Sequence, residues 1–181
     1  MVVITKLLYL ALTATVTTAT AIIRRDVIAV QNDITQKMGP SWNTLNNDLN
    51  GFPNSGFVGA ITIRDDIANI VSILESTLSD IKSTGAFGTV SGTTILADIQ
   101  LQVPTMLASL VTIGAQQSAW EAMQGGSWVL TQLESMRIAT SNFMDAVIAA
   151  EPLVLKPGAL ALKTGMTGAF NTAIAAYAVS E

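Results

Sequence analysis

The sequence contains neither cysteine nor histidine among its 181 residues. Without cysteine the chain can form no disulfide, so packing alone must hold the fold together. Without histidine it lacks the Ser-His-Asp and Cys-His arrangements of hydrolases and the common zinc ligand sets. We therefore expect no catalytic residues, no bound metal and no cofactor.

Charged residues are also scarce, at 12% of the chain, whereas half of all residues are hydrophobic. From Asp26 onward there are six basic and thirteen acidic residues, and six minus thirteen gives a net charge of −7. Such a surface would repel nucleic acid, whose binders present a basic face, and it gains nothing from anionic lipid head groups. The composition indicates that the protein binds something apolar.

The first 21 residues have the order of a secretory signal peptide. Lys6 provides an early positive charge, an apolar run follows from residue 7 to about residue 16, and a small-residue A-x-A pattern ends at Ala21. The alternative is an N-terminal membrane helix, but the run is shorter than the roughly 20 residues that a bilayer needs. We expect residues 1–21 to be removed and the mature chain to have no transmembrane segment.

Two adjacent arginines, Arg24 and Arg25, follow this segment. They suit the acidic pocket of a protease that cuts after paired basic residues, so we interpret residues 22–25 as a short propeptide. The alternative is a basic pair on a solvated terminus. After the second cut the chain would begin at Asp26, whose carboxylate can cap a helix start. Residues 26–181 then form one domain, large enough to bury a core.

Apolar residues recur at steps of three and four along this domain, which places them on one face of a helix. Gly39-Pro40 interrupts the first ladder without changing its phase, so we expect a kinked helix or two helices that meet there. Residues 50–56 indicate a loop, and a second ladder runs over residues 63–81. The first ladder consists of Val27, Val30, Ile34, Met38, Trp42, Leu45 and Leu49.

A third helical segment is expected from about Thr93 to Gln124, with Pro104 as a kink or as the start of a new helix. Ser127 is expected to cap the fourth segment. Residues 151–158, EPLVLKPG, predict the last linker before a final ladder up to Tyr177. No alternating β pattern of useful length appears. The sequence therefore predicts an all-α bundle of five to six long amphipathic helices.

Methionine and aromatic residues gather in the last three helical segments. Methionine fits irregular apolar shapes, including varied ligands, but simple core filling explains the same pattern. Thr140 lies within an apolar stripe, where its hydroxyl needs either the carbonyl four residues earlier or a ligand head group. The adjacent Asp65 and Asp66 diverge on a helix, so we interpret them as a charged, solvated helix end and not as an acid–base pair.

The stretch RRDVIAVQNDI at residues 24–34, followed by charge-poor, cysteine-free amphipathic helices up to about Tyr177, resembles the fungal hydrophobic surface-binding protein A family, also called cell-wall mannoprotein 1-like (galactomannoprotein) domains. The resemblance implies a five-helix bundle, secretion, adsorption to hydrophobic surfaces and no enzymatic activity. Some members enclose a long-chain fatty acid between the helices. Many continue into a Ser/Thr-rich region with a GPI signal, but this chain stops at AAYAVSE. We expect an extracellular protein, at most loosely wall-associated, without a GPI anchor.

The sequence thus predicts a secreted helical protein that binds hydrophobic surfaces, fatty acids or other lipids. The apolar ligand would be bound either inside a bundle that stays closed or by a bundle that opens and spreads its apolar faces on a surface. The alternative is a secreted effector or recruiter that docks a host protein or hydrolase through its acidic surface and binds no lipid. The predicted lipid-binding residues are Met106, Leu110, Met136, Thr140, Phe143, Met144, Val147, Met166, Phe170 and Tyr177.

Overall fold

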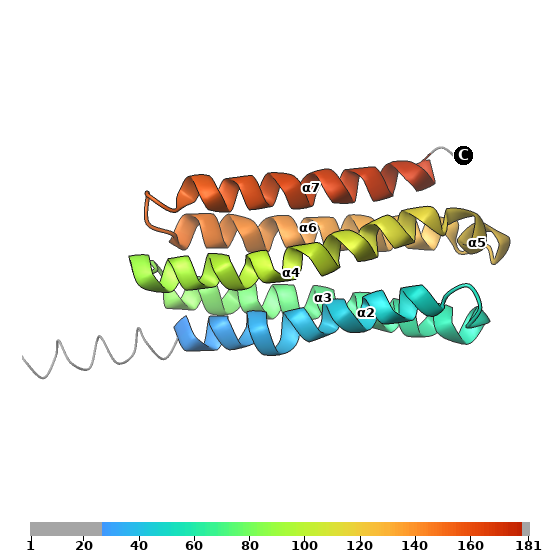
Figure 1. Cartoon of the computed structure of the whole chain (residues 1–181), viewed down its shortest axis with the longest axis horizontal. Helices are drawn as coiled ribbons and strands as arrows, with labels where there is room; N and C mark the ends of the chain where they lie inside the picture. Colours follow the sequence, from blue (N-terminus) through green and yellow to red (C-terminus); the bar gives the residue numbers. More distant parts are fainter. Residues whose placement is uncertain (1–26, 179–181) are drawn as a thin grey trace, which may run out of the picture.

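The computed structural model describes residues 27–178, which are helical apart from short connections (Figure 1). The predicted signal peptide, the cut after Arg25 and the capping by Asp26 lie outside the described residues. The elements are η1 (Asp33–Met38, a π-helix), α2 (Gly39–Gly51), α3 (Gly56–Thr84), α4 (Thr89–Ala115), α5 (Gln117–Ala122), α6 (Gly126–Ala150) and α7 (Lys156–Ala178). The prediction of an all-α bundle with five to six long helices is confirmed.

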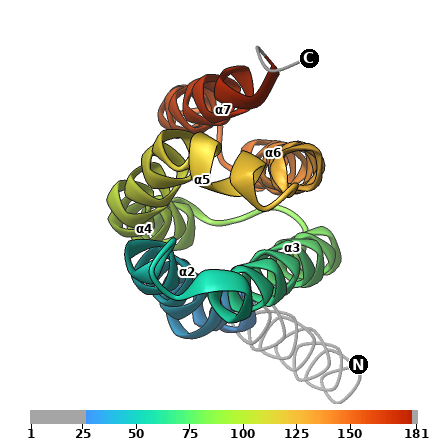
Figure 2. The same cartoon turned by 90° about the vertical axis from the view of Figure 1, so that its right-hand side faces the viewer.

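The five long helices form a closed ring. α2 packs against α3, α3 against α6, α6 against α7, α7 against α4, and α4 back against α2. Figure 2 shows this ring nearly end-on, with α5 across one end. At that end Trp120 of α5 stacks on Phe52, with ring centroids 4.3 Å apart. The colours in Figure 1 show that α2, α4 and α7 run in one direction and α3 and α6 in the other.

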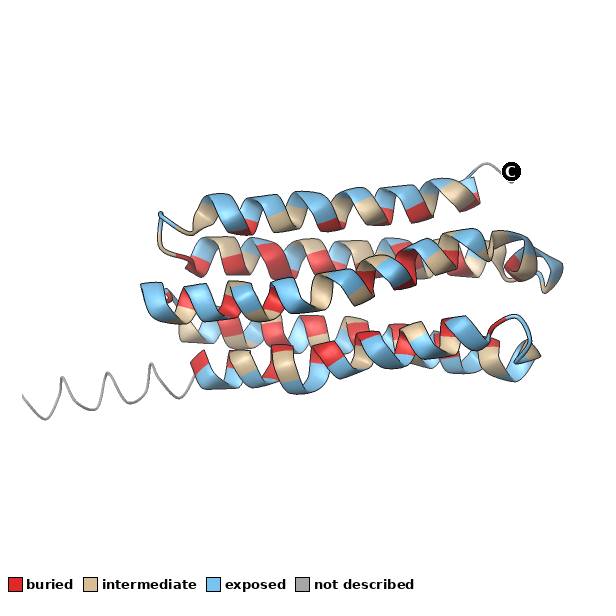
Figure 3. Cartoon of the chain, viewed as in Figure 1, coloured by how far each residue is buried: buried red, intermediate tan, exposed pale blue. Residues whose placement is uncertain are grey.

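The predicted apolar ladders are the inward faces of these helices (Figure 3). In α3, for example, Ile63, Ile67, Ile70 and Leu74 are at most 2% exposed. Their spacing matches the 3.6-residue turn, so one face of a helix of 29 residues reaches the core along its length. Removing a branched apolar side chain of this size from water contributes about 1.5–3 kcal/mol as an upper bound.

Both predicted irregularities next to proline are present, but neither ends a helix. The π-helix η1 directly precedes Gly39, and the chain continues from it into α2 without a break. α4 continues through Pro104 and changes direction near its middle (Figure 1). Proline lacks the N–H that would bond to the carbonyl four residues earlier, which accounts for a bend in a continuous helix.

Two predicted boundaries of the later helices were wrong. The expected segment from Thr93 to Gln124 starts earlier, at Thr89, and is divided at Gln116. There the Gln116 side-chain amide donates to the carbonyls of Leu49 and Phe52, at 2.7 and 2.8 Å, and so attaches the turn to the end of α2.

Ser127 does not cap α6. The helix begins at Gly126, and the carbonyl of Gly125 already accepts a bond from the Val129 N–H at 3.0 Å. The last linker is also shorter than residues 151–158, because α7 begins at Lys156. Pro157 is thus in the first turn, where its missing N–H costs nothing.

Candidate functional site

A small cavity lies on the axis of the ring. All five long helices and η1 contribute to its lining, and its volume is about 10 Å³, room for at most one water. Met38 reaches it from η1, and π-helical turns occur frequently at functional sites. The lining residues are Met38, Trp42, Leu74, Ile99, Gln102, Val103, Met106, Thr140, Phe143 and Met166.

Thr140 places a polar group without a partner on this axis. The residue is 5% exposed, and its Oγ1 makes no hydrogen bond to any described residue. Other helical threonines bond to the carbonyl four residues earlier, as Thr77 does to Ile73 at 2.8 Å. The sequence allowed two partners for the Thr140 hydroxyl, the carbonyl four residues earlier or a ligand head group. The bond to the carbonyl is not observed, so the Thr140 hydroxyl is available to a ligand.

Gln102 is the other polar residue of the lining, and it is half-buried. Its amide lies against Gly39 at the start of α2, where a Cβ would overlap the Gln102 side chain. The glycine therefore lets the amide approach the backbone closely. The cavity thus combines one hydroxyl and one amide with an otherwise apolar wall, the usual composition of a small-molecule site.

The predicted lipid-binding residues are all buried, but the structure divides them among three places. Met106, Thr140, Phe143 and Met166 line the axial cavity. Leu110 lines a groove between α4 and α7. The others belong to the packed core around the cavity, namely Met136, Met144, Val147, Phe170 and Tyr177. Their role in lipid binding stays a prediction.

Tyr177 has a structural contact of its own. Its hydroxyl donates to the Ile113 carbonyl at 2.6 Å and so ties the end of α7 to the end of α4. Burial, with a smaller contribution from the charge of Glu121, raises the pKa of this phenol above its usual range. The bond therefore persists at any ordinary pH.

Sequence reasoning missed the contribution of the first helices to the site. Met38, Trp42 and Leu74 lie on the first and second apolar ladders, but nothing in those ladders showed that they meet on one axis. The missing signal is the ring order, which brings η1, α2 and α3 opposite α6 and α7. Gln102 had no signal in the sequence, because its place depends on the close approach to Gly39.

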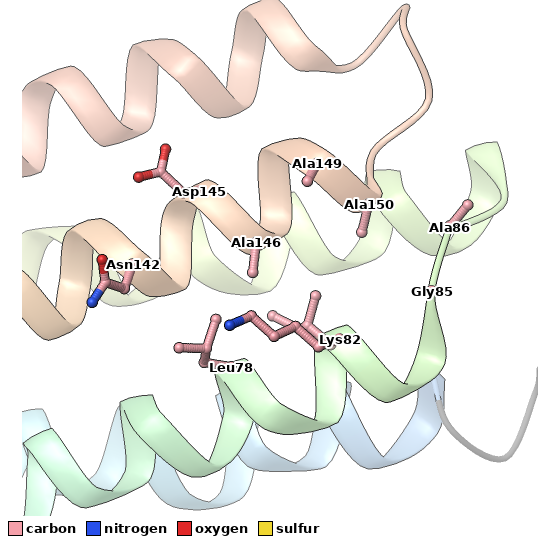
Figure 4. A pocket seen from close by; sticks show the side chains of 10 residues that line it. Leu78, Lys82, Gly85, Ala86, Asn142, Asp145, Ala146, Ala149 and Ala150 are labelled. Carbon is pink, nitrogen blue, oxygen red and sulfur yellow. The ribbon is translucent and has the colours of Figure 1, made fainter.

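A surface hollow of about 680 Å³ lies between α3 and α6 (Figure 4). Ala146, Ala149 and Ala150 form one wall, and the Lys82 side chain runs along the space between the helices. Asp145 points toward α7, where its carboxylate accepts a bond from Lys163 at 2.6 Å. This groove shares no lining residue with the axial cavity.

A second groove follows the junction between α4 and α7. It consists of two hollows of about 500 and 430 Å³, which have Leu107 in common. None of its lining residues is charged, and Gln100 and Thr172 are the polar ones. Two of its residues, Val103 and Met166, also line the axial cavity. We call this feature the α4/α7 groove.

Two carboxyl groups outside the cavity, those of Glu151 and Asp66, have a pKa raised to about 7. Glu151 is 3% exposed, neither of its carboxylate oxygens has a hydrogen-bond partner among the described residues, and burial raises its pKa to about 7. Asp66 is half-buried and shares a hydrogen bond with Asp48 of α2. Burial, that bond and the charges of Asp48 and Asp65 raise the pKa of Asp66 to about 7. The interpretation of Asp65 and Asp66 as a solvated helix end was wrong, because both lie inside α3; Asp65 is exposed there, but Asp66 is half-buried.

By length and apolar composition, α4 is the described helix that could cross a membrane. Its residues Ile95, Ile99, Met106 and Leu110 nevertheless pack into the core of the ring, and core helices of soluble proteins pass the same test. The absence of a transmembrane segment from the mature chain stays a prediction. Within residues 27–178 no group of three or more acidic side chains could hold a metal ion.

A ring of helices with an apolar axis, one unpartnered hydroxyl on it and a shared wall with a surface groove defines a helical-bundle protein built to take up an apolar ligand. Residues 27–149 match the family of hydrophobic surface binding protein A. The chain belongs to this family, and the resemblance noted from the sequence is confirmed.

Solved structures share the fold. AfMp4p in complex with palmitic acid is 20% identical with a TM-score of 0.79, over 83% of this chain and 99% of that chain. Ligand binding domain 1 of the Penicillium marneffei MP1 protein, complexed with arachidonic acids, is 15% identical with a TM-score of 0.77, over 83% and 98% of the two chains. Domain 2 of the same protein, complexed with multiple arachidonic acids, is 14% identical with a TM-score of 0.75, over 83% and 96%. A comparison with curated protein sequences gave no significant match.

Proposed function

We propose that this protein is a secreted, non-enzymatic binder of long-chain fatty acids, which it holds along the axis of its helical ring, and that it adsorbs to hydrophobic surfaces. The observation that carries the proposal is the axial cavity, to which every long helix contributes and in which the Thr140 hydroxyl has no partner among the described residues. Family membership supports adsorption, and the palmitic and arachidonic acids of the structural neighbours support the ligand class.

The energetics favour an acyl chain on this axis. Each buried CH₂ contributes about 0.8 kcal/mol, so a sixteen-carbon chain offers about 10 kcal/mol before ordering costs. The ring must widen to accept it, because ligand cavities measure roughly 300–1,000 Å³ and the axial cavity is far smaller. Flexible Met38, Met106 and Met166 line the cavity and can repack around a chain.

The carboxylate end of the ligand needs hydrogen-bond donors. Thr140, Gln102 and Trp42 are the residues of the cavity lining with side-chain donors, and we assign the orientation of the head group to the Thr140 hydroxyl and the Gln102 amide. Affinity comes mainly from the apolar contacts, because a hydrogen bond exchanged with water contributes only about 0.5–1.5 kcal/mol, or 1.5–3 kcal/mol when it involves a charged group. No feature of the described residues favours an effector or recruiter that binds no lipid.

We propose that the protein is secreted. The signal peptide would be cleaved after Ala21, and a second cut after Arg24-Arg25 would leave Asp26 as the first residue of the mature chain. Native mass spectrometry of the secreted protein tests ligand and processing together. The expected mass is that of residues 26–181 plus a copurified fatty acid, and the delipidated protein should bind palmitate saturably. Absence of both copurified lipid and palmitate binding would refute the ligand proposal. A start at Ile22 would refute only the second cut.

A further inference from the structure

We propose that the α4/α7 groove is the lateral entrance through which an acyl chain passes between solvent and the axis of the ring. The inference rests on the proposed function, because it concerns how that ligand reaches its site. The proposed occupant of the groove is a single acyl chain. The need for an entrance follows from the fold, since the axial cavity is enclosed by helices on every side of the ring.

The two residues shared by groove and cavity place the entrance. Val103 of α4 and Met166 of α7 line both spaces, so they form the wall between them. Val103 is half-buried and Met166 is 5% exposed. Methionine has three rotatable bonds and changes shape easily, so rotation of one side chain would join the groove to the cavity. On the other side of that wall the Thr140 hydroxyl faces the cavity without a partner among the described residues.

The helix backbones are also least constrained at this point. Pro104 follows Val103 directly, so the carbonyl of Gln100 receives no bond from an N–H there, and Gln100 itself lines the groove. On α7 the facing residues include Gly158 and Gly165. A Cβ added at either glycine would have no neighbouring atom within 4 Å. The far end of the junction is held by the bond from Tyr177 to Ile113. Opening is therefore expected near Val103 and Met166 and not near the C-terminus of α7.

The chemistry of the groove fits an acyl chain better than that of the other large hollow. The α4/α7 groove has no charged lining residue, whereas the α3/α6 groove contains Lys82 and Asp145. An acyl chain that enters between α4 and α7 therefore removes water from no charged side chain of the groove. The α3/α6 groove also has no residue in common with the cavity, so passage from it would require a second wall to open.

Two glycines of α7 provide a matched pair of variants. Gly165 lines the groove, whereas Gly168 is exposed and is absent from the linings of both hollows. A Cβ would meet nothing within 4 Å at either position. The first carbon of a new side chain therefore meets no other atom at either position, so Gly165→Phe adds bulk at the groove and Gly168→Phe adds the same side chain outside it. Both changes replace a helix-interior glycine with a better helix former, so neither should destabilise the fold.

The experiment measures palmitate uptake and release by stopped-flow tryptophan fluorescence, since Trp42 lines the cavity. We expect Gly165→Phe to slow both rates by about tenfold or more, with an equilibrium affinity within about twofold of wild type, as a blocked passage requires. Gly168→Phe should match wild type in both.

Uptake by Gly165→Phe at the wild-type rate would overturn the entrance and leave fatty-acid binding intact. Weakened affinity with unchanged uptake would also overturn it, because the groove would then be part of the binding site. A wild-type protein that takes up no palmitate would overturn the proposed function and the entrance with it. Circular dichroism of the three proteins confirms that all remain helical.

Discussion

Thr140 combines burial with an unsatisfied hydroxyl, and this combination has opposite consequences for the empty and the loaded protein. Replacing it with the nearly isosteric valine removes a polar group that the empty protein must desolvate without a partner. We expect Thr140→Val to raise the free energy of unfolding of the empty protein by about 1 kcal/mol. We also expect palmitate affinity to fall by about tenfold, because a donor to the carboxylate is lost.

Thr77→Val is the matched control for this change. Thr77 is also fully buried, but its hydroxyl bonds to the Ile73 carbonyl and lies outside the cavity lining. Denaturant unfolding and palmitate titration of both variants give the two quantities. If Thr140→Val binds palmitate as wild type does, the hydroxyl has no role in head-group recognition.

Glu151 should make the protein less stable as the pH rises. Its pKa is about 7 in the folded protein, above its ordinary value of 4.5, so between these values the folded state binds more protons than the unfolded state. Stability is therefore greatest below about pH 4.5 and falls until about pH 7. Glu151→Gln should remove this loss, which is of the order of 2–3 kcal/mol for a carboxyl so little exposed.

The measurement is the midpoint of urea unfolding for wild type and Glu151→Gln between pH 4 and pH 8. Asp66 has the same direction of pKa shift, so the variant should keep part of the slope. A variant that loses stability at pH 8 would show that the ionised carboxylate of Glu151 has a favourable partner in solution.

At the scale of elements, Pro104 lies in the interior of α4, far from both ends of the helix. Proline in a helix interior is about 3 kcal/mol less favourable than alanine, although native packing around a bend recovers part of this. We expect Pro104→Ala to raise the free energy of unfolding by about 1–2 kcal/mol, because it restores an N–H for the Gln100 carbonyl. Thermal unfolding measures the change. A lower midpoint would mean that the bend is needed for packing against α2 or α7.

The elements were largely predictable from the sequence, whereas their arrangement was not. Each apolar ladder gave the buried face of its helix, and Met38, Trp42 and Leu74 were assigned to those faces correctly. Periodicity carries that information because it depends only on the turn of a single helix. Which helix lies opposite which depends on connections and packing, so the predicted lipid-binding residues came from α4, α6 and α7 alone, and the existence of a cavity could not be predicted.

The predictions of helix ends were wrong for a related reason. Gln116 interrupts the third segment through bonds to the carbonyls of Leu49 and Phe52, more than sixty positions earlier in the chain. No local pattern reports such a contact. Gly125 likewise takes the capping position that Ser127 was expected to hold, because its carbonyl accepts the first bond of the helix.

For the whole molecule, ligand binding and stability are linked. A ligand that binds only the folded ring stabilises it by about 2.7 kcal/mol at a concentration one hundredfold above Kd. For a domain of this size we expect palmitate to raise Tm by about 5–10 °C, measured by scanning calorimetry with octanoate as a short-chain comparison. An unchanged Tm, with adsorption to hydrophobic beads retained, would indicate that adsorption comes from the opened bundle or its outer surface.

Adsorption itself should withstand salt. Residues 26–181 have a formal net charge of −7, and the α4/α7 groove has no charged lining residue. Apolar contact is not screened by ions, whereas pairing between exposed charges is. We expect binding to uncharged hydrophobic beads to be retained as ionic strength rises from about 0.1 to 1 M, measured by depletion from solution. Release at high salt would identify electrostatic attraction as the cause.

A closed ring of five helices cannot alternate in direction all the way round, because five is odd. The chain satisfies alternation only within its two hairpins, α2 with α3 and α6 with α7, and α4 remains as a single helix between parallel neighbours (Figures 1 and 2). Parallel neighbours bring like ends of their dipoles together, and no tight turn can join them. An odd number of helices requires only one parallel junction, but this order has three, and they divide the ring into two hairpins and one closing helix. Both grooves lie on junctions between these pieces, α3 with α6 and α4 with α7. The diameter of the ring can therefore change at these junctions without altering the turn within either hairpin.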